Sequence, residues 1–220
     1  MTPRKTDHRT RVGRQRSART ESRILEAALG VFADMGPDSP KIDDFVAAAD
    51  ISRGTFYNHF ESVEELLTAT SEWTTRETIR VIEAALEGID GPAMRLGIGS
   101  RLFLAKAQAD RVWSRFVGRV WQLGGRELPE RDLEEGLRLG VFRFPSLIAA
   151  RDLWFGSTRE ALLRIGSERT PPGYGAQMTE VLLQALGVDS RRIAAVLKHD
   201  LPELPAREGS STRRASRAAT

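Results

Sequence analysis

Apolar residues near the beginning of the chain recur at every third or fourth position, which is the spacing of one buried helix face. Thr20 can cap the start of this helix, and Gly36 can end it as the residue after its last turn. We therefore expect a first helix over residues 20–35. Its inward positions are Ile24, Leu25, Ala28, Val31, Phe32 and Met35.

Three further helices are expected before residue 90, and each has a start signal typical of helix N-termini. The start signals are Ser39-Pro40, Ser52 and the capping box Ser62-Val63-Glu64-Glu65. The expected ranges are 40–49, 53–59 and 62–88. A tight turn at residues 50–52 separates the first two of these helices.

From Gly91-Pro92 onward the pattern stays helical, and no stretch alternates apolar and polar residues for long enough to form a strand. Further helices are expected over residues 111–123, 132–139, 145–165, 174–186 and 190–199. The predicted fold class is all-α, with a small N-terminal helical domain joined to a larger one. The expected divisions are a basic flexible arm over 1–19, domains over 20–67 and 68–202, and a disordered tail over 203–220.

Composition is that of a globular protein, since the chain has 220 residues and 40% of them are hydrophobic. No window approaches the roughly 18 uninterrupted apolar residues of a membrane span. The N-terminus has basic residues without a following apolar stretch, so we expect a soluble, unexported protein in the cytoplasm. The absence of cysteine excludes disulfides, thiolate metal sites and a cysteine nucleophile, and it agrees with a reducing cytosol.

Charge is distributed unevenly, although the formal net charge of the chain is only +3. Residues 1–19 carry seven cations against one acid, and the body between this segment and the basic tail carries a net −5. A basic end in front of an acidic body favours contact with a polyanion through that end. The alternative is a solvated leader without a partner.

Residues 39–60 combine a short helix, a three-residue turn and a second short helix, placed behind the longer first helix. This is the arrangement of a DNA-binding helix-turn-helix. Gly54 leaves no side chain between the backbone and a duplex, while Ser52 and Thr55 at the helix start can donate to phosphate. The inward anchors are Ile51, Phe56 and Phe60.

Two segments, which span three of the expected helices, carry a specific pattern of residue types and spacings. They are Thr20-x-x-Arg23-Ile24-Leu25-x-Ala27-Ala28-x-x-Val31-Phe32-x-x-x-Gly36 and Ile51-Ser52-Arg53-Gly54-Thr55-Phe56-Tyr57-Asn58-His59-Phe60-x-Ser62-x-Glu64-x-Leu66. Over residues 20–67 the chain resembles the DNA-binding domain of the TetR/AcrR regulators. The resemblance implies a homodimeric transcriptional regulator, most often a repressor. Such a protein binds a palindromic site on double-stranded DNA and releases it when a small lipophilic effector enters the C-terminal domain.

The resemblance assigns Tyr57 and His59 to phosphate contacts, Thr55 to a further backbone contact, and Arg53 and Asn58 to base reading. An arginine fork fits guanine O6 and N7, and an asparagine amide can pair with an adenine edge. The expected DNA-binding residues are Lys41, Ser52, Arg53, Gly54, Thr55, Tyr57, Asn58 and His59. For Tyr57 and His59 the alternative is an ordinary helix surface or core position.

Three residues depart from the family pattern. Asp50 stands where the turn usually has glycine, a change that a residue tolerant of left-handed conformations can accept. Lys41 replaces a usual Ser or Thr at the start of the second helix, and Val63 replaces a common Lys. These changes alter the expected set of phosphate contacts.

Aromatic residues are plentiful in the second domain, and small-molecule sites are mostly apolar with few polar groups. The alternative for each of these residues is plain hydrophobic core. The expected effector-binding residues are Phe103, Trp113, Phe116, Val117, Trp121 and Trp154. The polar side chains that could orient a ligand or simply face solvent are Lys106, Gln108 and Gln122.

Apolar stripes on the helices over 145–165 and 174–186 are expected to pair with their symmetry mates in a dimer, or to bury within one chain. The stripe residues are Leu153, Ala161, Leu162, Met178, Val181, Leu182 and Leu186. One alternative keeps the DNA-binding domain and uses the rest only for dimerisation or a protein partner. An enzyme is disfavoured, since none of the three histidines is placed beside a nucleophile or paired carboxylate, and no cofactor or metal motif is present.

Overall fold

The structure is a computed structural model that describes residues 5–120 and 127–201. Within these ranges the chain forms ten α-helices and no strand, so the all-α prediction is confirmed. The helices are α1 (Lys5–Met35), α2 (Ile42–Ala49), α3 (Arg53–Tyr57), α4 (Val63–Ala85), α5 (Pro92–Ala109), α6 (Arg111–Arg119), α7 (Glu127–Arg138), α8 (Leu147–Ser167), α9 (Tyr174–Ala185) and α10 (Ser190–Lys198).

The first helix begins much earlier than its apolar pattern indicates. Helix α1 starts at Lys5, so the predicted start at Thr20 is wrong and the basic segment is helical from that residue onward. The Thr20 hydroxyl donates to the carbonyl oxygen of Arg16 at 3.0 Å, a bond made inside a helix and not at its cap. Arginine and glutamine have good intrinsic helix propensity, which lets the helix continue without a buried face.

The short helices around the turn form close to their predicted positions. Helix α2 starts at Ile42, two residues later than expected, and the Asp44 carboxylate accepts from the Lys41 backbone N–H at 2.7 Å. Asp50 ends α2 in the left-handed conformation (φ 50°, ψ 58°), as expected for the residue in place of glycine. The Ser52 hydroxyl oxygen then accepts from the Thr55 N–H at 3.1 Å, which starts α3.

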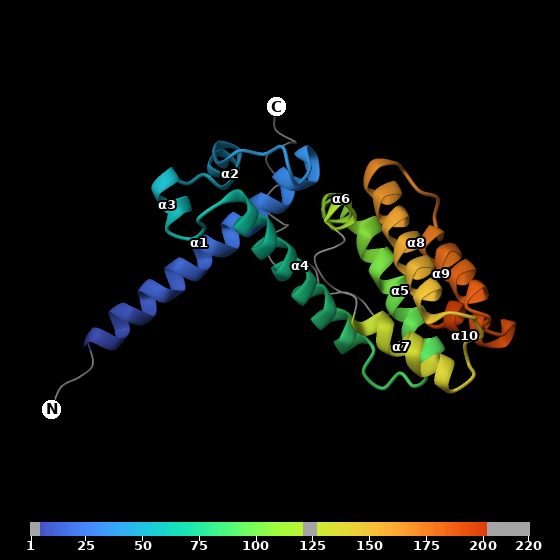
Figure 1. The fold of residues 1–220 in the computed structure, drawn as a ribbon. Coiled ribbons are helices and arrows are strands. Elements are labelled where there is room, and N and C mark those ends of the chain that lie inside the picture. The colour runs from blue at the N-terminus through green and yellow to red at the C-terminus, as the bar shows by residue number, and fades with distance from the viewer. Residues whose placement is uncertain (1–4, 121–126, 202–220) are drawn as a thin grey trace.

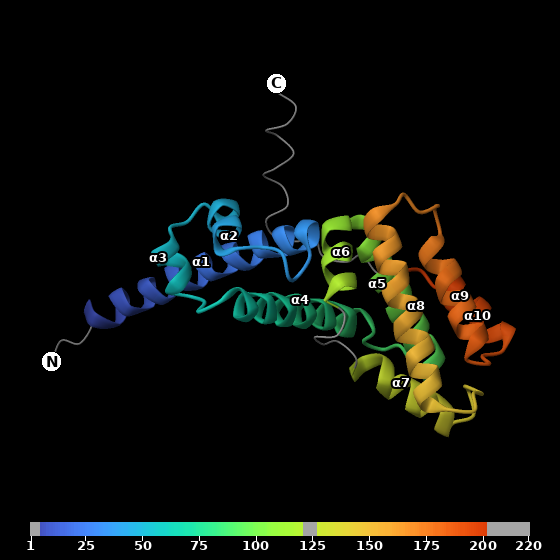
Figure 2. The ribbon, with the colours of Figure 1, turned by 45° about the horizontal axis from the view of Figure 1, so that its top comes forward.

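The larger part of the molecule is built around α5, which packs against α7, α8, α9 and α10. Figures 1 and 2 show α1–α3 at one end of the molecule and α5 with α7–α10 at the other. Helix α4 runs between the two groups. Helix α6 ends at Arg119, four residues before its predicted end, and the expected Gly124-Gly125 stop lies outside the described residues, as does the tail over 203–220.

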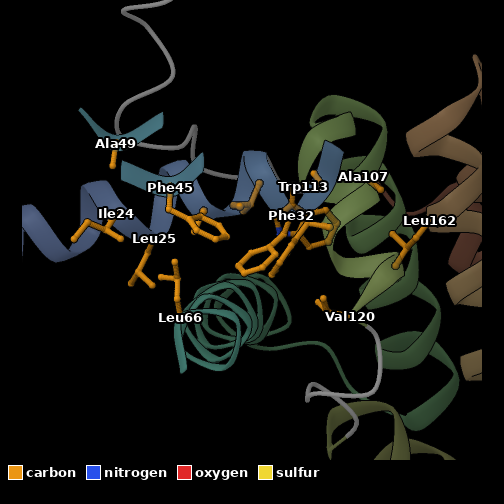
Figure 3. Close-up of a cluster of buried hydrophobic side chains, with 14 of the residues drawn as sticks. Ile24, Leu25, Phe32, Phe45, Ala49, Leu66, Ala107, Trp113, Val120 and Leu162 are labelled. Carbon is orange, nitrogen blue, oxygen red and sulfur yellow. The ribbon is translucent and has the colours of Figure 1, made fainter. Parts of the chain in front are cut away.

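One hydrophobic core runs through both ends of the molecule. The Phe32 ring of α1 lies with its centroid 4.8 Å from that of Phe45 in α2 and 6.2 Å from that of Phe116 in α6. Figure 3 shows Phe45, Leu66 and Trp113, from three other helices, facing this side of α1. Because Phe32, Phe45 and Phe116 are all fully buried, α6 and the helix-turn-helix share a single packed interior.

Asp50 is the one residue other than glycine with positive φ in the described part of the chain, and this leads to a stability prediction. A side chain in the left-handed region costs about 1 kcal/mol, which glycine avoids. Asp50→Gly should therefore raise the free energy of unfolding in urea by up to about 1 kcal/mol, and Asp50→Ala should lower it. Asp38→Gly, at a loop position that does not have a positive φ, should bring no gain. A loss of stability in Asp50→Gly would contradict this explanation of the turn.

Candidate nucleic-acid interface and buried cavity

Helix α3 presents one polar face to solvent and one apolar face to the core. Arg53, Gly54, Tyr57 and Asn58 are exposed, whereas Phe56 is fully buried. The Tyr57 side chain is 55% exposed, although its ring contacts Phe56 edge-on with centroids 5.7 Å apart. Of the side chains predicted to contact DNA, those of Arg53, Tyr57 and Asn58 are thus open to solvent, as a DNA-binding helix requires.

Arg53 is held by a carboxylate from the neighbouring helix. Its Nε and Nη2 donate to the two oxygens of Asp43 in α2, at 2.7 and 2.5 Å, in the forked geometry that arginine also uses with guanine. These hydrogen bonds lower the pKa of Asp43 and raise that of Arg53, so both groups stay charged at neutral pH. Both side chains are 64% exposed, which keeps the pair open to exchange with another acceptor.

The remaining predicted DNA-binding residues surround α3. The hydroxyls of Ser52 and Thr55 hydrogen bond to each other at 2.9 Å, and Lys41 is exposed at the start of α2. His59 follows the end of α3 and is half-buried beside Phe60, with ring centroids 6.3 Å apart. On α1, Arg11, Arg14, Arg16 and Arg19 are exposed, which gives the same end of the molecule a basic surface.

A cavity of about 820 Å³, including its open mouth, lies among α4, α5, α6, α7 and α8. Its surface is mostly apolar, as that of small-molecule sites usually is. The lining residues are Thr74, Thr75, Thr78, Ile79, Ile82, Leu86, Arg95, Leu96, Gly99, Ser100, Phe103, Trp113, Val117, Pro129, Asp132, Trp154, Phe155 and Thr158.

Four of the six residues expected to bind an effector lie in this wall: Phe103, Trp113, Val117 and Trp154. Phe116 lies outside the lining, because its fully buried ring packs toward Phe32, and Trp121 lies outside the described residues. Among the possible orienting groups, Lys106 lies over the Trp113 ring, 5.0 Å from its centroid. Gln108 donates to the Thr170 hydroxyl at 3.1 Å, and Gln122 is outside the described residues.

Sequence reasoning missed the contribution of α4, whose threonines recur every four residues. Thr70, Thr74 and Thr78 form one buried row, and the last two line the cavity. The spacing was visible in the sequence and is that of a single helix face. Threonine is common on helix surfaces, however, so the repeat gave no sign of burial.

A charged pair forms the strongly polar part of the wall. The Asp132 carboxylate, with a side chain 4% exposed, lies 3.3 Å from Nε of Arg95 and 3.9 Å from Nε of Arg131. Burial raises the pKa of Asp132, and the two arginines oppose this rise. Among the described lining residues Arg95 and Asp132 alone carry charge, and each compensates the other.

The apolar stripes on α8 and α9 divide into a buried and an exposed part. Ala161, Leu162 and Leu182 are buried within the chain, as is Leu186 directly after α9, which agrees with the intramolecular alternative for these positions. Leu153 and Val181 remain 42% and 58% exposed. Helices α8 and α9 lie side by side at the end away from α1–α3 (Figures 1 and 2), and each carries one of these exposed apolar side chains.

Other classes of site find no support in the described residues. They contain no group of three or more His, Asp or Glu side chains that could hold a metal ion. Within the same ranges, no helix is long and apolar enough to cross a bilayer.

Comparison with known proteins places the DNA-reading segment in a defined family. The family described as "Bacterial regulatory proteins, tetR family" matches residues 24–70. The HTH-type transcriptional regulator CymR of Pseudomonas putida is 37% identical over 70% of this chain and 93% of its own length. The HTH-type transcriptional repressor DhaR of a Mycobacterium species is 34% identical over 36% of this chain and 40% of its own.

Solved structures share the whole fold. RolR in complex with resorcinol aligns with a TM-score of 0.62 and 25% identity, over 87% of this chain and 99% of its own. An ArpA-like γ-butyrolactone receptor aligns with the same TM-score and 19% identity, over 83% of this chain and 94% of its own. The similarity therefore extends from the helix-turn-helix through the helices that enclose the cavity.

The raised pKa of Asp132 has a consequence for stability against pH. Above the ordinary carboxyl pKa of about 4, the folded chain keeps a proton that the unfolded chain has released. The stability contributed by this proton is present at low pH and is lost as pH rises through the raised pKa. The free energy of unfolding of wild type minus that of Asp132→Asn should therefore fall as pH rises from about 4.

Asp189 supplies the control, because hydrogen bonds from Arg192 lower its pKa. Its stabilising contribution is lost as pH falls, so Asp189→Asn should change the pH dependence with the opposite sign. Urea unfolding from about pH 2 to about pH 7 measures both differences, since that of Asp189→Asn changes below about pH 4 and that of Asp132→Asn above it. A difference for Asp132→Asn that rises with pH would mean that pairing with Arg95 outweighs burial.

Proposed function

Because the chain belongs to the TetR family of bacterial regulatory proteins, we propose that it is a cytoplasmic, homodimeric repressor that a small lipophilic effector releases from a palindromic operator. The observation that carries this proposal is the position of α6. One face of α6 contributes Trp113 and Val117 to the cavity, while Phe116 on the same helix packs toward Phe32 of α1. A molecule in the cavity therefore touches the helix that supports the DNA-reading end.

Polar contacts strengthen this connection between α6 and α1. Arg119 donates from Nη1 to the carbonyl oxygen of Ala33 at 2.9 Å, and Arg115 pairs through Nη2 with Asp34 at 2.7 Å. Helix α4 provides a second connection, since it packs against α1 and also contributes Thr74 to the cavity wall. Ligand binding that favours another arrangement of α4 or α6 would shift the population of DNA-binding conformations.

The chemistry of α3 supports DNA binding by this chain. We assign base reading to Arg53 and Asn58, which are exposed, and phosphate contacts to Tyr57 and His59 with Ser52 and Thr55. The exposed arginines of α1 add a basic surface that can contact the backbone of a duplex. No catalytic role is assigned to these groups.

The proposed ligand class and the assignment of repression, and not activation, are based on similar proteins. RolR was solved with resorcinol, a small aromatic molecule, and the wall of this cavity carries several aromatic side chains. DhaR is named a repressor. We accordingly assign repression, with effector entry among α4–α8 as the event that ends it.

Dimerisation is assigned to α8 and α9, whose exposed apolar residues have no partner helix within the described chain. Two-fold pairing of two helices from each copy would bury Leu153 and Val181 in a four-helix bundle. Gly156 is exposed on α8, three residues after Leu153, with nothing within 4 Å of its Cβ position, so a second helix can approach closely.

Mutations within α3 should separate base reading from phosphate holding. Arg53→Ala should weaken operator binding about fivefold to a hundredfold and leave random-sequence binding much less affected, because a bidentate base contact is lost. Tyr57→Phe and His59→Ala should weaken binding to both duplexes alike. Fluorescence anisotropy with operator and scrambled duplexes at several salt concentrations measures these effects.

Arg80→Ala is the matched control, since Arg80 is an exposed, paired arginine on α4. It should leave both affinities unchanged. Equal losses on the two duplexes for Arg53→Ala would make Arg53 a phosphate contact, and no loss in any α3 variant would contradict DNA binding through this helix.

A charge on the exposed face of α9 should split the dimer. Val181→Glu should shift the protein from dimer to monomer in sedimentation experiments, because the carboxylate would be buried without a partner. Leu182 is unsuitable for this test, since it is 2% exposed and a charge there would disturb the monomer. Leu139→Glu, an equally exposed position outside α8 and α9, should remain dimeric, and a monomeric wild type at micromolar concentration would contradict the assignment.

A further inference from the structure

Two hydroxyl groups in the cavity wall have no hydrogen-bond partner among the described residues. They are Oγ1 of Thr74 on α4 and Oγ1 of Thr158 on α8, and both residues are 5% exposed. A buried hydroxyl without a partner is costly, so such groups are usually satisfied in folded proteins. Two in the wall of one cavity indicate that a bound molecule supplies the partners.

Among the buried threonines of the described residues, Thr74 and Thr158 are the two whose hydroxyl lacks a hydrogen-bond partner. Thr70, Thr78 and Thr179 each donate to the carbonyl oxygen four residues earlier, at 2.7, 2.8 and 2.9 Å. Thr78 is the closest comparison, because it lies one turn after Thr74 on α4 and lines the same cavity. Its hydroxyl is already used within the helix, whereas that of Thr74 is free for a ligand.

The charges of the wall restrict the ligand further. Arg95 and Asp132 neutralise each other, and Arg131 also faces the Asp132 carboxylate. An anionic ligand would have to displace Asp132 from Arg95 and leave a buried carboxylate, which is unfavourable. The aromatic side chains Phe103, Trp113, Trp154 and Phe155 favour a flat ring, so a neutral aromatic molecule fits this wall best.

We propose that the effector is a neutral aromatic molecule with two hydrogen-bonding groups, one bound by the Thr74 hydroxyl and the other by the Thr158 hydroxyl. This inference rests on the proposed function of the cavity and adds the chemistry and the attachment points of the ligand. Thr74 and Thr158 stand on helices that make few contacts with each other, so the bound molecule itself bridges α4 and the body of the domain.

The ligand class can be tested by measuring the affinities of four small molecules for the protein by calorimetry in the absence of DNA. Resorcinol has two hydroxyls, phenol has one, toluene has none, and benzoate is an anion. Resorcinol should bind about threefold to tenfold more tightly than phenol, and phenol more tightly than toluene, with benzoate weakest. Tighter binding of toluene or benzoate than of resorcinol, or no binding of resorcinol at millimolar concentration, would overturn the proposal.

Isosteric variants test the attachment points. Thr74→Val and Thr158→Val should each weaken resorcinol binding about threefold to tenfold and leave toluene binding unchanged. Thr70→Val should change neither, because Thr70 is buried on α4 outside the cavity lining and its hydroxyl is used within the helix. Equal effects of Thr74→Val and Thr70→Val on resorcinol would refute the role of Thr74. Thermal unfolding gives a second measurement, since valine removes an unpartnered hydroxyl at Thr74 and Thr158 and should raise the ligand-free Tm, but should not do so at Thr70.

Adding operator DNA distinguishes failure of this inference from failure of the repressor function. If resorcinol binds through both threonines but leaves the operator complex intact, the ligand class holds and release by effector is wrong. If the operator complex dissociates with toluene or benzoate and not with resorcinol, release by effector holds and the ligand class is wrong.

Discussion

The packing of Phe32 is the contact on which the rest of the structure depends. This α1 side chain is 1% exposed and lies between Phe45 of the helix-turn-helix and Phe116 of α6. Closely packed interiors do not deform continuously, so a displacement of α6 must be followed by α1 or leave a void. The same contact therefore stabilises the helix-turn-helix end, and in the proposed function it also connects that end to the occupancy of the cavity.

The ion pair between Arg53 and Asp43 is a second important interaction, and it lies at the proposed DNA-binding surface. Asp43 holds the Arg53 fork in the absence of DNA, and the pair is largely exposed. Any acceptor on DNA must compete with a carboxylate that is already bound at both oxygens. A guanine edge offers two acceptors in matching geometry, whereas a single phosphate oxygen offers a poorer replacement. For the base-reading role proposed for Arg53, the intramolecular pair would thus favour sequence reading over unspecific attachment.

Sequence patterns predicted the helical fold and the turn well, because capping residues and apolar spacing act locally. Ser52 and Ser62 cap α3 and α4 as expected, and Asp50 adopts the left-handed conformation. The start of α1 was missed because basic residues extend a helix without an apolar pattern. The free hydroxyls of Thr74 and Thr158 could not be predicted at all, since only the packing of α4 and α8 around the cavity decides which threonine lacks a partner.

The central claim, that occupancy of the cavity changes the spacing of the two DNA-reading helices, can be measured as a distance. The chain has no cysteine, so Ala47→Cys on the exposed side of α2 introduces a single spin-label site in each protomer. Electron–electron double resonance would give the distance between the labels in the dimer. We expect one distance distribution with operator and a displaced one when resorcinol fills the cavity. An unchanged distribution with the cavity filled would contradict the proposed coupling.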